Sequence, residues 1–138
     1  MHLDQADLFE GMDRLFIQGF MALSTEEHYA KGDFIFRIGD KSEFFYTLLE
    51  GCVKIYIGDE EVKVYSINQS GEAFGLSTIL DRNYYFASAA CLEPTKLLKI
   101  YGNSLNQFLQ DHPVNSSVFY KRIANRLAQR LLECYKFI

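Results

Sequence analysis

The sequence predicts a mainly β domain, in which a closed or sandwiched antiparallel sheet carries helices at both ends. Short alternating apolar runs separated by glycine turns fill residues 29–101. Aromatic residues make up 15% of the chain, all of them Phe or Tyr, and these residues favour half-buried sheet surfaces. Helical spacing of apolar residues is confined to residues 1–28 and 102–138. We therefore expect N-terminal helices, a central sheet and C-terminal helices in one domain.

The bulk properties are those of a single globular domain. The chain has 138 residues, of which 49% are hydrophobic, enough for a core without disulfides or metal. A net charge of −4 argues against direct nucleic-acid binding. Cys52, Cys91 and Cys134 form no CxxC pair, which is typical of a reducing compartment. Because neither a signal peptide nor a membrane-spanning run is visible, we expect a cytoplasmic protein without membrane contact.

The N-terminal segment shows apolar residues at spacings of three and four, which indicates helix. These residues are Leu8, Phe9, Met12, Leu15, Phe16, Phe20 and Leu23. Gly11 and Gly19 are expected to divide the helix into short pieces.

The central segment predicts a series of short strands. The alternating or apolar runs are 34–38, 44–49, 53–57, 62–65, 86–91 and 96–101. Gly58-Asp59 joins the third and fourth runs as a hairpin turn, and Pro94 lies in the last turn. Residues 71–80 interrupt the strands with two glycines, Gly71 and Gly75, followed by a short helix-compatible run.

The C-terminal segment predicts a short helix capped by Ser104, a break at His112-Pro113, and a long helix from about residue 114. Candidate caps of the long helix are Asn115, Ser116 and Ser117. Spacings of four and three define a seam of Tyr120, Ala124, Leu127, Leu131, Cys134 and Ile138. We predict that this seam forms a homodimer coiled coil; the alternative is a stripe that packs on its own domain.

Other side chains that could carry chemistry are scattered. The basic residues Lys121, Arg122, Arg126, Arg130 and Lys136 have helical spacing, and we interpret them as a solvated helix face. His2, His28 and His112 lie outside the predicted strands and far apart, so no metal site is predicted. Neither Ser70 nor Ser88 has a paired histidine near it in sequence, so we predict no catalytic residue and no enzyme activity.

Four glycine-centred motifs occur in order along the central segment. They are Lys31-Gly32-Asp33, Ile38-Gly39-Asp40, Leu49-Glu50-Gly51 continuing to Tyr56, and Gly71-Glu72-Ala73-Phe74-Gly75. As a set, followed by a long helix, they resemble the cyclic nucleotide-binding domain family, which includes the sensor halves of the catabolite-activator and fumarate-nitrate regulators. The resemblance implies a jelly-roll-like β-roll (a double-stranded β-helix) of eight strands, with a short helix inside the roll.

The resemblance also implies a ligand site. The family's phosphate-binding cassette begins with Phe-Gly-Glu and ends with Arg-x-Ala-Ser; Phe74-Gly75 and Ala87-Ser88 match its two ends. Gly75 allows close backbone approach, and the amides of Leu76, Ser77 and Thr78 would begin the short helix, which suits an anion. The expected ligand-binding residues are therefore Phe74, Gly75, Leu76, Ser77, Thr78, Tyr85, Ala87 and Ser88, with Arg82 and Arg130 as possible anion contacts.

Two positions depart from the family pattern. Leu76 stands where the family has the Glu that holds the ribose hydroxyl, and Tyr85 stands where it has the Arg that pairs with the cyclic phosphate. Each lost partner costs about 1–3 kcal/mol, so binding is expected to weaken by roughly two to four orders of magnitude.

Three functions remain open. The first is a non-enzymatic sensor, the effector domain of a transcription-regulator-like protein, which binds a small anionic or apolar effector and signals through the long helix. The second is an interaction or dimerisation protein whose pocket is filled by Leu76 and Tyr85. The third is cAMP or cGMP binding with Arg82 as a substitute arginine, although we expect Arg82 and Arg130 to be solvated. No cofactor is expected beyond such a nucleotide.

Overall fold

The computed structural model describes residues 8–58 and 63–135. Its helices are α1 (Arg14–Leu23), α2 (Gly102–Asp111), α3 (Pro113–Tyr135) and the 3-10 helix η2 (Leu76–Ile79). Its strands are β1 (Thr25–Tyr29), β2 (Phe34–Phe36), β3 (Phe44–Glu50), β4 (Val53–Tyr56), β5 (Lys63–Ile67), β6 (Ala73–Phe74), β7 (Ser88–Cys91) and β8 (Thr95–Tyr101).

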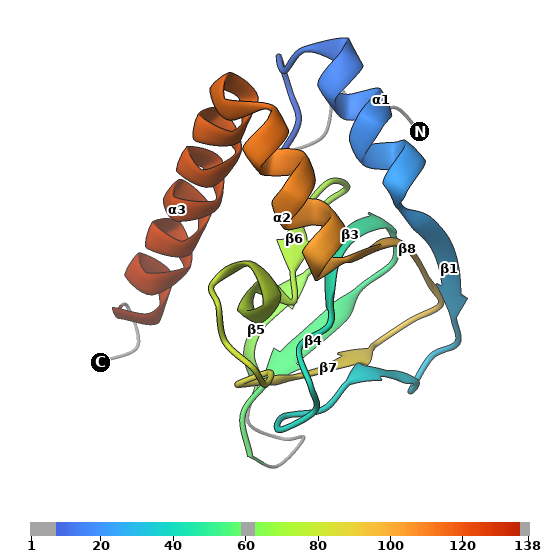
Figure 1. Cartoon of the computed structure of the whole chain (residues 1–138). Helices are drawn as coiled ribbons and strands as arrows, with labels where there is room; N and C mark the ends of the chain where they lie inside the picture. The colour runs from blue at the N-terminus through green and yellow to red at the C-terminus, as the bar shows by residue number, and fades with distance from the viewer. Residues whose placement is uncertain (1–7, 59–62, 136–138) are drawn as a thin grey trace.

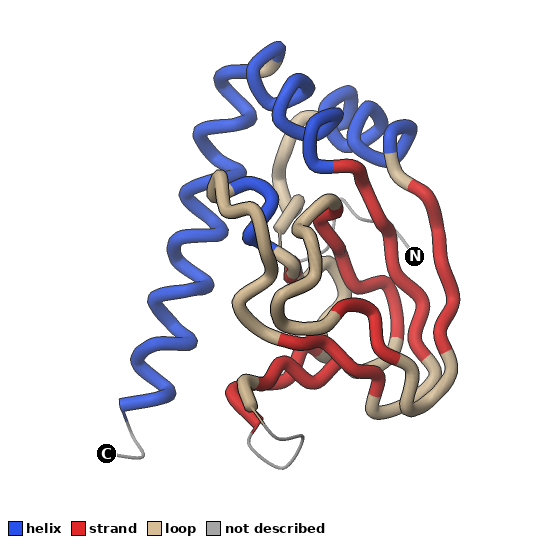
Figure 2. The backbone as a smooth tube through the Cα atoms, turned by 60° about the horizontal axis from the view of Figure 1, so that its bottom comes forward, coloured by secondary structure: helices blue, strands red, loops and turns tan. Residues whose placement is uncertain are grey.

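The strands form two antiparallel sheets of four, in the orders β1-β8-β3-β6 and β2-β7-β4-β5. Strands distant in sequence are neighbours, as in the pairing of β3 with β8 and of β4 with β7. Figures 1 and 2 show the two sheets closing into a roll, with α1 and α2 over one end and α3 running along one side. The predicted β-roll with flanking helices and an internal short helix is confirmed.

Several boundaries differ from the prediction. β1 begins at Thr25, inside the segment expected to be helical, because Thr25–Tyr29 pairs with β8 at the sheet edge. Its residues are exposed or half-buried, so the apolar alternation that marks a strand is missing there. β2 and β7 are shorter than predicted, since Ile38 and Phe86 lie outside them and are exposed.

The two C-terminal helices begin earlier than the cap residues suggest. α2 starts at Gly102 and has Tyr101 as its N-cap, so Ser104 lies inside the helix. α3 starts at Pro113, whose fixed φ suits the first helical position and whose missing N–H costs nothing there. The first backbone bond into α3 runs from Ser116 N to His112 O, at 2.9 Å.

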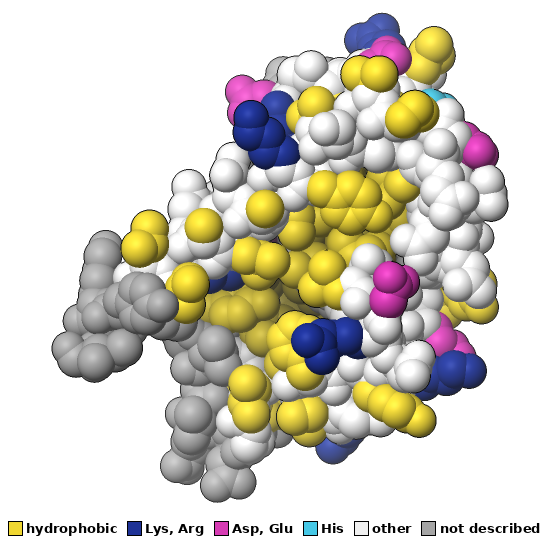
Figure 3. Space-filling view, turned by 60° about the vertical axis from the view of Figure 1, so that its left-hand side comes forward, with side chains coloured by type: hydrophobic (Ala, Val, Ile, Leu, Met, Phe, Trp, Pro, Cys, Tyr) yellow, Lys and Arg dark blue, Asp and Glu magenta, His cyan; other side chains and the backbone are white. Residues whose placement is uncertain are grey.

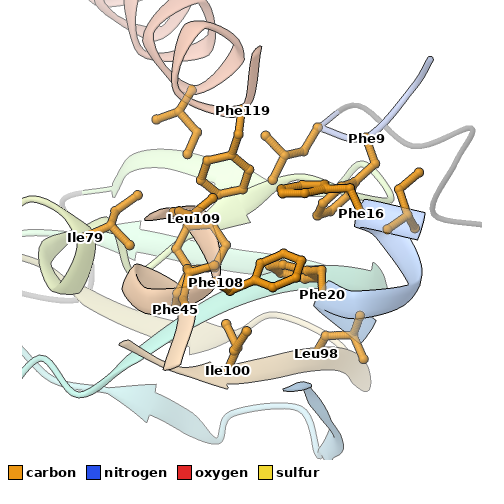
Figure 4. Packing of buried hydrophobic residues seen from close by; sticks show 14 of the residues in the cluster. Phe9, Phe16, Phe20, Phe45, Ile79, Leu98, Ile100, Phe108, Leu109 and Phe119 are labelled. Carbon is orange, nitrogen blue, oxygen red and sulfur yellow. The ribbon is translucent and has the colours of Figure 1, made fainter. Parts of the chain in front are cut away.

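Two hydrophobic cores follow from the alternation of side chains along the strands. On β3, Phe45 faces the helices, whereas Tyr46 and Leu48 face the inside of the roll. The outer core joins α1, α2 and α3 to the first sheet, and Figure 4 shows its aromatic centre. α3 is thus held at its N-terminal half by fully buried Phe119, while its C-terminal half lies beside the roll.

Candidate functional site

A cavity of about 230 Å³ lies between the roll and the C-terminal half of α3. Figure 3, which looks onto the side that carries α3, shows hydrophobic side chains gathered in a hollow. The cavity is lined by Phe36, Ile55, Tyr65, Gly75, Leu76, Ser77, Tyr85, Phe86, Ala87, Leu127, Arg130 and Leu131. Within this described lining, Arg130 is the only charged side chain, so the site favours apolar molecules.

Gly75 fixes the start of η2 at the cavity wall. Its backbone is left-handed, with φ +70, and a Cβ there would lie 2.8 Å from Cδ2 of Tyr46. Only glycine meets both demands without strain. The chain therefore turns sharply after the buried Phe74 and brings Leu76 and Ser77 to the cavity.

Tyr85 occupies the position where the resemblance implies a phosphate-binding arginine. Its side chain is 4% exposed, and its ring stacks on Phe36 with centroids 3.9 Å apart. The hydroxyl donates to the Phe44 carbonyl oxygen at 2.6 Å and accepts from Phe44 N at 3.2 Å. Burial raises the pKa of Tyr85 to about 12, despite the opposing hydrogen bonds with Phe44 and Tyr46, so the phenol stays neutral. A neutral, packed ring replaces a cation here.

The other cassette positions are divided between the cavity and the core. Leu76 is 7% exposed and belongs to the outer core as well as to the cavity wall. Ser88 is buried, and its Oγ accepts a hydrogen bond from Ile38 N at 2.8 Å. Thr78 packs against Gly102 of α2. Phe74, Thr78 and Ser88 are therefore not in the cavity lining.

Arg82 is exposed, as expected, in the loop after η2. Its guanidinium carbon lies 6.0 Å from the centroid of the Phe86 ring, and the residue is not part of the cavity lining.

The prediction that Arg130 is a solvated helix-face arginine was wrong. It is 9% exposed, and its Nη2 lies 2.9 Å from Glu72 Oε2. Its guanidinium carbon also lies 4.4 Å from the Tyr65 ring centroid. The partner was not visible in the sequence because Glu72 lies 58 positions earlier, in the turn before β6.

Glu72 forms the centre of a buried ion cluster. It is 1% exposed, and Arg126 Nη2 contacts the same oxygen at 3.0 Å. The amides of Asn68 and Gln69 donate to its other oxygen. Burial alone would raise the pKa of Glu72, but the hydrogen bonds from Arg130 and Arg126 outweigh it and lower the pKa below its ordinary value. The cluster ties α3 to the roll beside the cavity.

The described part of the predicted dimer seam on α3 is exposed to solvent. Four of its residues are exposed: Tyr120 (40%), Leu127 (38%), Leu131 (53%) and Ala124. The Cys134 side chain and Ile138 lie outside the described residues. Leu127 and Leu131 also line the cavity, a role that the sequence did not indicate.

Sequence reasoning missed further lining residues, namely Phe36, Ile55, Tyr65 and Phe86. In the sequence, Phe36 and Ile55 were recognisable only as alternate apolar residues of strands. That both line one cavity depends on how the roll closes.

In the described parts of the chain, no group of three or more His, Cys, Asp or Glu side chains could hold a metal ion. None of the described helices is long and apolar enough to cross a membrane.

Residues 26–112 match the family model of the cyclic nucleotide-binding domain. The chain belongs to this family. Its sequence is 26% identical over 113 residues to an uncharacterized protein of Haemophilus influenzae, covering 80% of this chain and 88% of that one. It is 29% identical over 108 residues to the global nitrogen regulator of Synechocystis, covering 75% of this chain and 48% of the regulator. The chain therefore spans about half the length of that regulator.

Two solved structures place the fold among regulators. The sensor domain of the transcriptional regulator DNR from Pseudomonas aeruginosa has a TM-score of 0.74 and 28% identity, covering 95% of this chain and 89% of that one. The catabolite activator protein of Thermus thermophilus has a TM-score of 0.78 and 23% identity, covering 96% of this chain and 63% of that protein. The chain is thus a cyclic nucleotide-binding-type domain of the kind found in these regulators.

Proposed function

We propose that the domain is a non-enzymatic sensor module of a transcription-regulator-like protein, and that its effector is an apolar small molecule and not a cyclic nucleotide. The observation that carries the proposal is Tyr85. It fills the position of the phosphate-binding arginine with a neutral ring that is stacked and hydrogen-bonded inside the roll. A cyclic phosphate brought to this place would lose its hydration without gaining an ion pair.

The volume and lining of the cavity indicate the size and kind of effector. A dry apolar cavity of about 150 Å³ takes up benzene, and this cavity, at about 230 Å³, is larger. A molecule with one or two aromatic rings, or a short aliphatic molecule, would fit. Arg130 offers a single charged contact at the wall, so one polar group on the effector is compatible with the site.

Signalling would follow from the two-sided lining of the cavity. Phe36, Tyr85 and Ala87 belong to the roll side, whereas Leu127, Arg130 and Leu131 belong to α3. A ligand that contacts both sides favours the α3 position that maximises those contacts, which shifts the population of helix positions.

A second copy of the same chain is the proposed partner of α3. The seam has the four-three spacing of a coiled coil, and its described leucines are exposed in the isolated chain. Because Leu127 and Leu131 also line the cavity, the partner helix would lie close to the cavity. Effector binding and dimer geometry would then be linked.

The interaction-protein alternative also has support, since Leu76 and Tyr85 are buried at 7% and 4% exposure. These side chains fill the ribose and phosphate positions that the resemblance implies, and the cavity lies beside them. The two functions therefore differ in whether the remaining cavity accepts a ligand. Nucleotide binding rescued by Arg82 has no contact in its favour.

Indole is a suitable probe of the cavity because the chain contains no Trp that would mask its fluorescence. We expect saturable binding with a blue shift of indole emission. Ala87→Leu adds a side chain to the lining and should weaken binding at least about tenfold by filling the cavity. Ala128→Leu, an exposed α3 position outside the lining, is the matched control. Equal binding to both variants, or no binding to the wild type, would refute the apolar site.

A further inference from the structure

We propose that the protein has a second ligand site, for a small multivalent oxyanion such as a phosphoryl group, beside α3. A separate pocket of about 190 Å³ lies there, several times the ~30 Å³ that one water occupies in the liquid. Its polar lining comes entirely from α3 and consists of Arg122, Asn125, Arg126, Gln129 and Arg130. Among the described residues of this lining, none is acidic.

The three arginines form one stripe of the helix. Arg122, Arg126 and Arg130 are four positions apart, so each lies one turn from the next. Like charges at this spacing repel one another. Glu72 contacts Arg126 and Arg130 and offsets part of this repulsion, so two of the three arginines share one carboxylate. A ligand anion would offset more of it.

The guanidinium groups are held in place by other contacts. Arg122 Nη1 donates to the carbonyl oxygen of Leu8 at 3.2 Å. Arg126 and Arg130 contact Glu72 at 3.0 and 2.9 Å. Arg122 has no ion pair within the described parts of the chain. Among the described residues, its hydrogen-bond partner is a neutral carbonyl, so its guanidinium can also meet an incoming anion at the pocket wall.

The chemistry of the lining selects the ligand class. A guanidinium presents paired N–H donors that match two oxygens of one phosphoryl group, and such bonds are short and strong. Asn125 and Gln129 add amide groups between the arginines. A compact anion with several oxygens can use guanidinium and amide donors together, with different oxygens accepting from different donors.

The site is separate from the apolar cavity but shares a wall with it. Arg130 and Leu76 line both, whereas Arg122 lines only the basic pocket. The oxyanion site does not depend on the proposed apolar effector. Because of the shared wall, both ligands would act on the same segment of α3.

The test is a titration of the phosphate-free 138-residue chain with inorganic phosphate and with pyrophosphate at constant ionic strength, by calorimetry and by amide chemical shifts. We expect saturable binding, tighter for pyrophosphate, with shifts at residues 122–130. Arg122→Gln should weaken binding at least about tenfold, and Arg122→Lys less, because it keeps the charge but not the paired donors. Lys121→Gln, an exposed neighbour outside the lining, should change affinity by less than about twofold.

Three results would overturn the proposal: no saturable binding at millimolar anion, equal affinity in Arg122→Gln and wild type, or shifts located away from α3. The last would indicate an adventitious ion only. Indole binding by Arg122→Gln is measured as well, because Arg122 does not line the apolar cavity. It distinguishes failure of the oxyanion proposal from failure of the apolar site. A variant that binds indole normally but has lost pyrophosphate supports both assignments.

Discussion

The rings of Tyr85 and Phe36 lie nearly parallel, with an angle of 16° between their planes and 3.9 Å between their centroids. This contact joins the loop after η2 to β2 across the inside of the roll. Together with the hydrogen bonds between the Tyr85 hydroxyl and the Phe44 backbone, it makes Tyr85 a structural part of the core. Tyr85, which stands where the family has its phosphate-binding arginine, thus also stabilises this roll.

The first prediction concerns the stability that Tyr85 provides. Tyr85→Phe should lower the free energy of unfolding by about 1–2 kcal/mol, because the partly buried backbone groups of Phe44 lose a partner. Tyr85→Ala should cost about 3–5 kcal/mol, because the stacked ring is lost as well. Urea unfolding measures both. Tyr84→Phe is the matched control, since Tyr84 is 62% exposed, and its effect should stay within about 0.5 kcal/mol. Equal effects at positions 84 and 85 would contradict a structural role for Tyr85.

The second prediction concerns the ion cluster of Glu72. Its pKa is lowered from an ordinary value of 4.5, so its contribution to stability is fully present above that pH. The contribution is lost as pH falls through the lower pKa of the folded state. Glu72→Gln should cost about 3 kcal/mol at pH 7, because Arg130 keeps its charge in a buried position.

The measurement is urea unfolding of wild type and Glu72→Gln over a series of pH values from neutral to acid. The stability difference between them should shrink as the pH falls below about 4.5. Glu10→Gln, at an exposed position, serves as the control. A difference that stays constant over the whole pH range would show that the Glu72 carboxylate is not the stabilising group.

The third prediction concerns the dimer. Ala124→Glu places a charge in the seam without altering the cavity, because Ala124 is exposed and outside the lining. It should convert the dimer to a monomer at micromolar concentration, since two like charges would face each other across a closely packed interface. Sedimentation equilibrium gives the oligomeric state. Ala128→Glu, one turn further along but outside the seam, should leave the dimer intact. A monomeric wild type, or equal behaviour of the two variants, would contradict the proposed partner.

The sequence predicted the fold well because its signals were local. Glycine turns, strand alternation and the His112-Pro113 break each depend on adjacent residues. β1 escaped prediction because Glu26 and Glu27 lie on an edge strand whose residues are exposed or half-buried. An edge strand is defined by its partner, here β8, and its own residues carry little of the pattern.

The site was predicted only in part, because its decisive contacts are non-local. The resemblance placed Leu76 and Tyr85 at the departures from the family pattern, and both are buried. The pairing of Arg130 with Glu72 joins positions 58 residues apart, and helical spacing alone suggested a solvated arginine. The apolar cavity likewise depends on how α3 lies beside the roll.

Calorimetric titration of the purified protein with cAMP, and with cGMP alongside, tests the central claim most directly. Tyr85 and Leu76 stand where the family has the Arg and the Glu that hold the nucleotide. We therefore predict no detectable heat at high ligand concentration. Binding of either nucleotide with micromolar or tighter affinity would contradict the account, since it would show that another arginine supplies the phosphate contact in place of the one that Tyr85 has replaced.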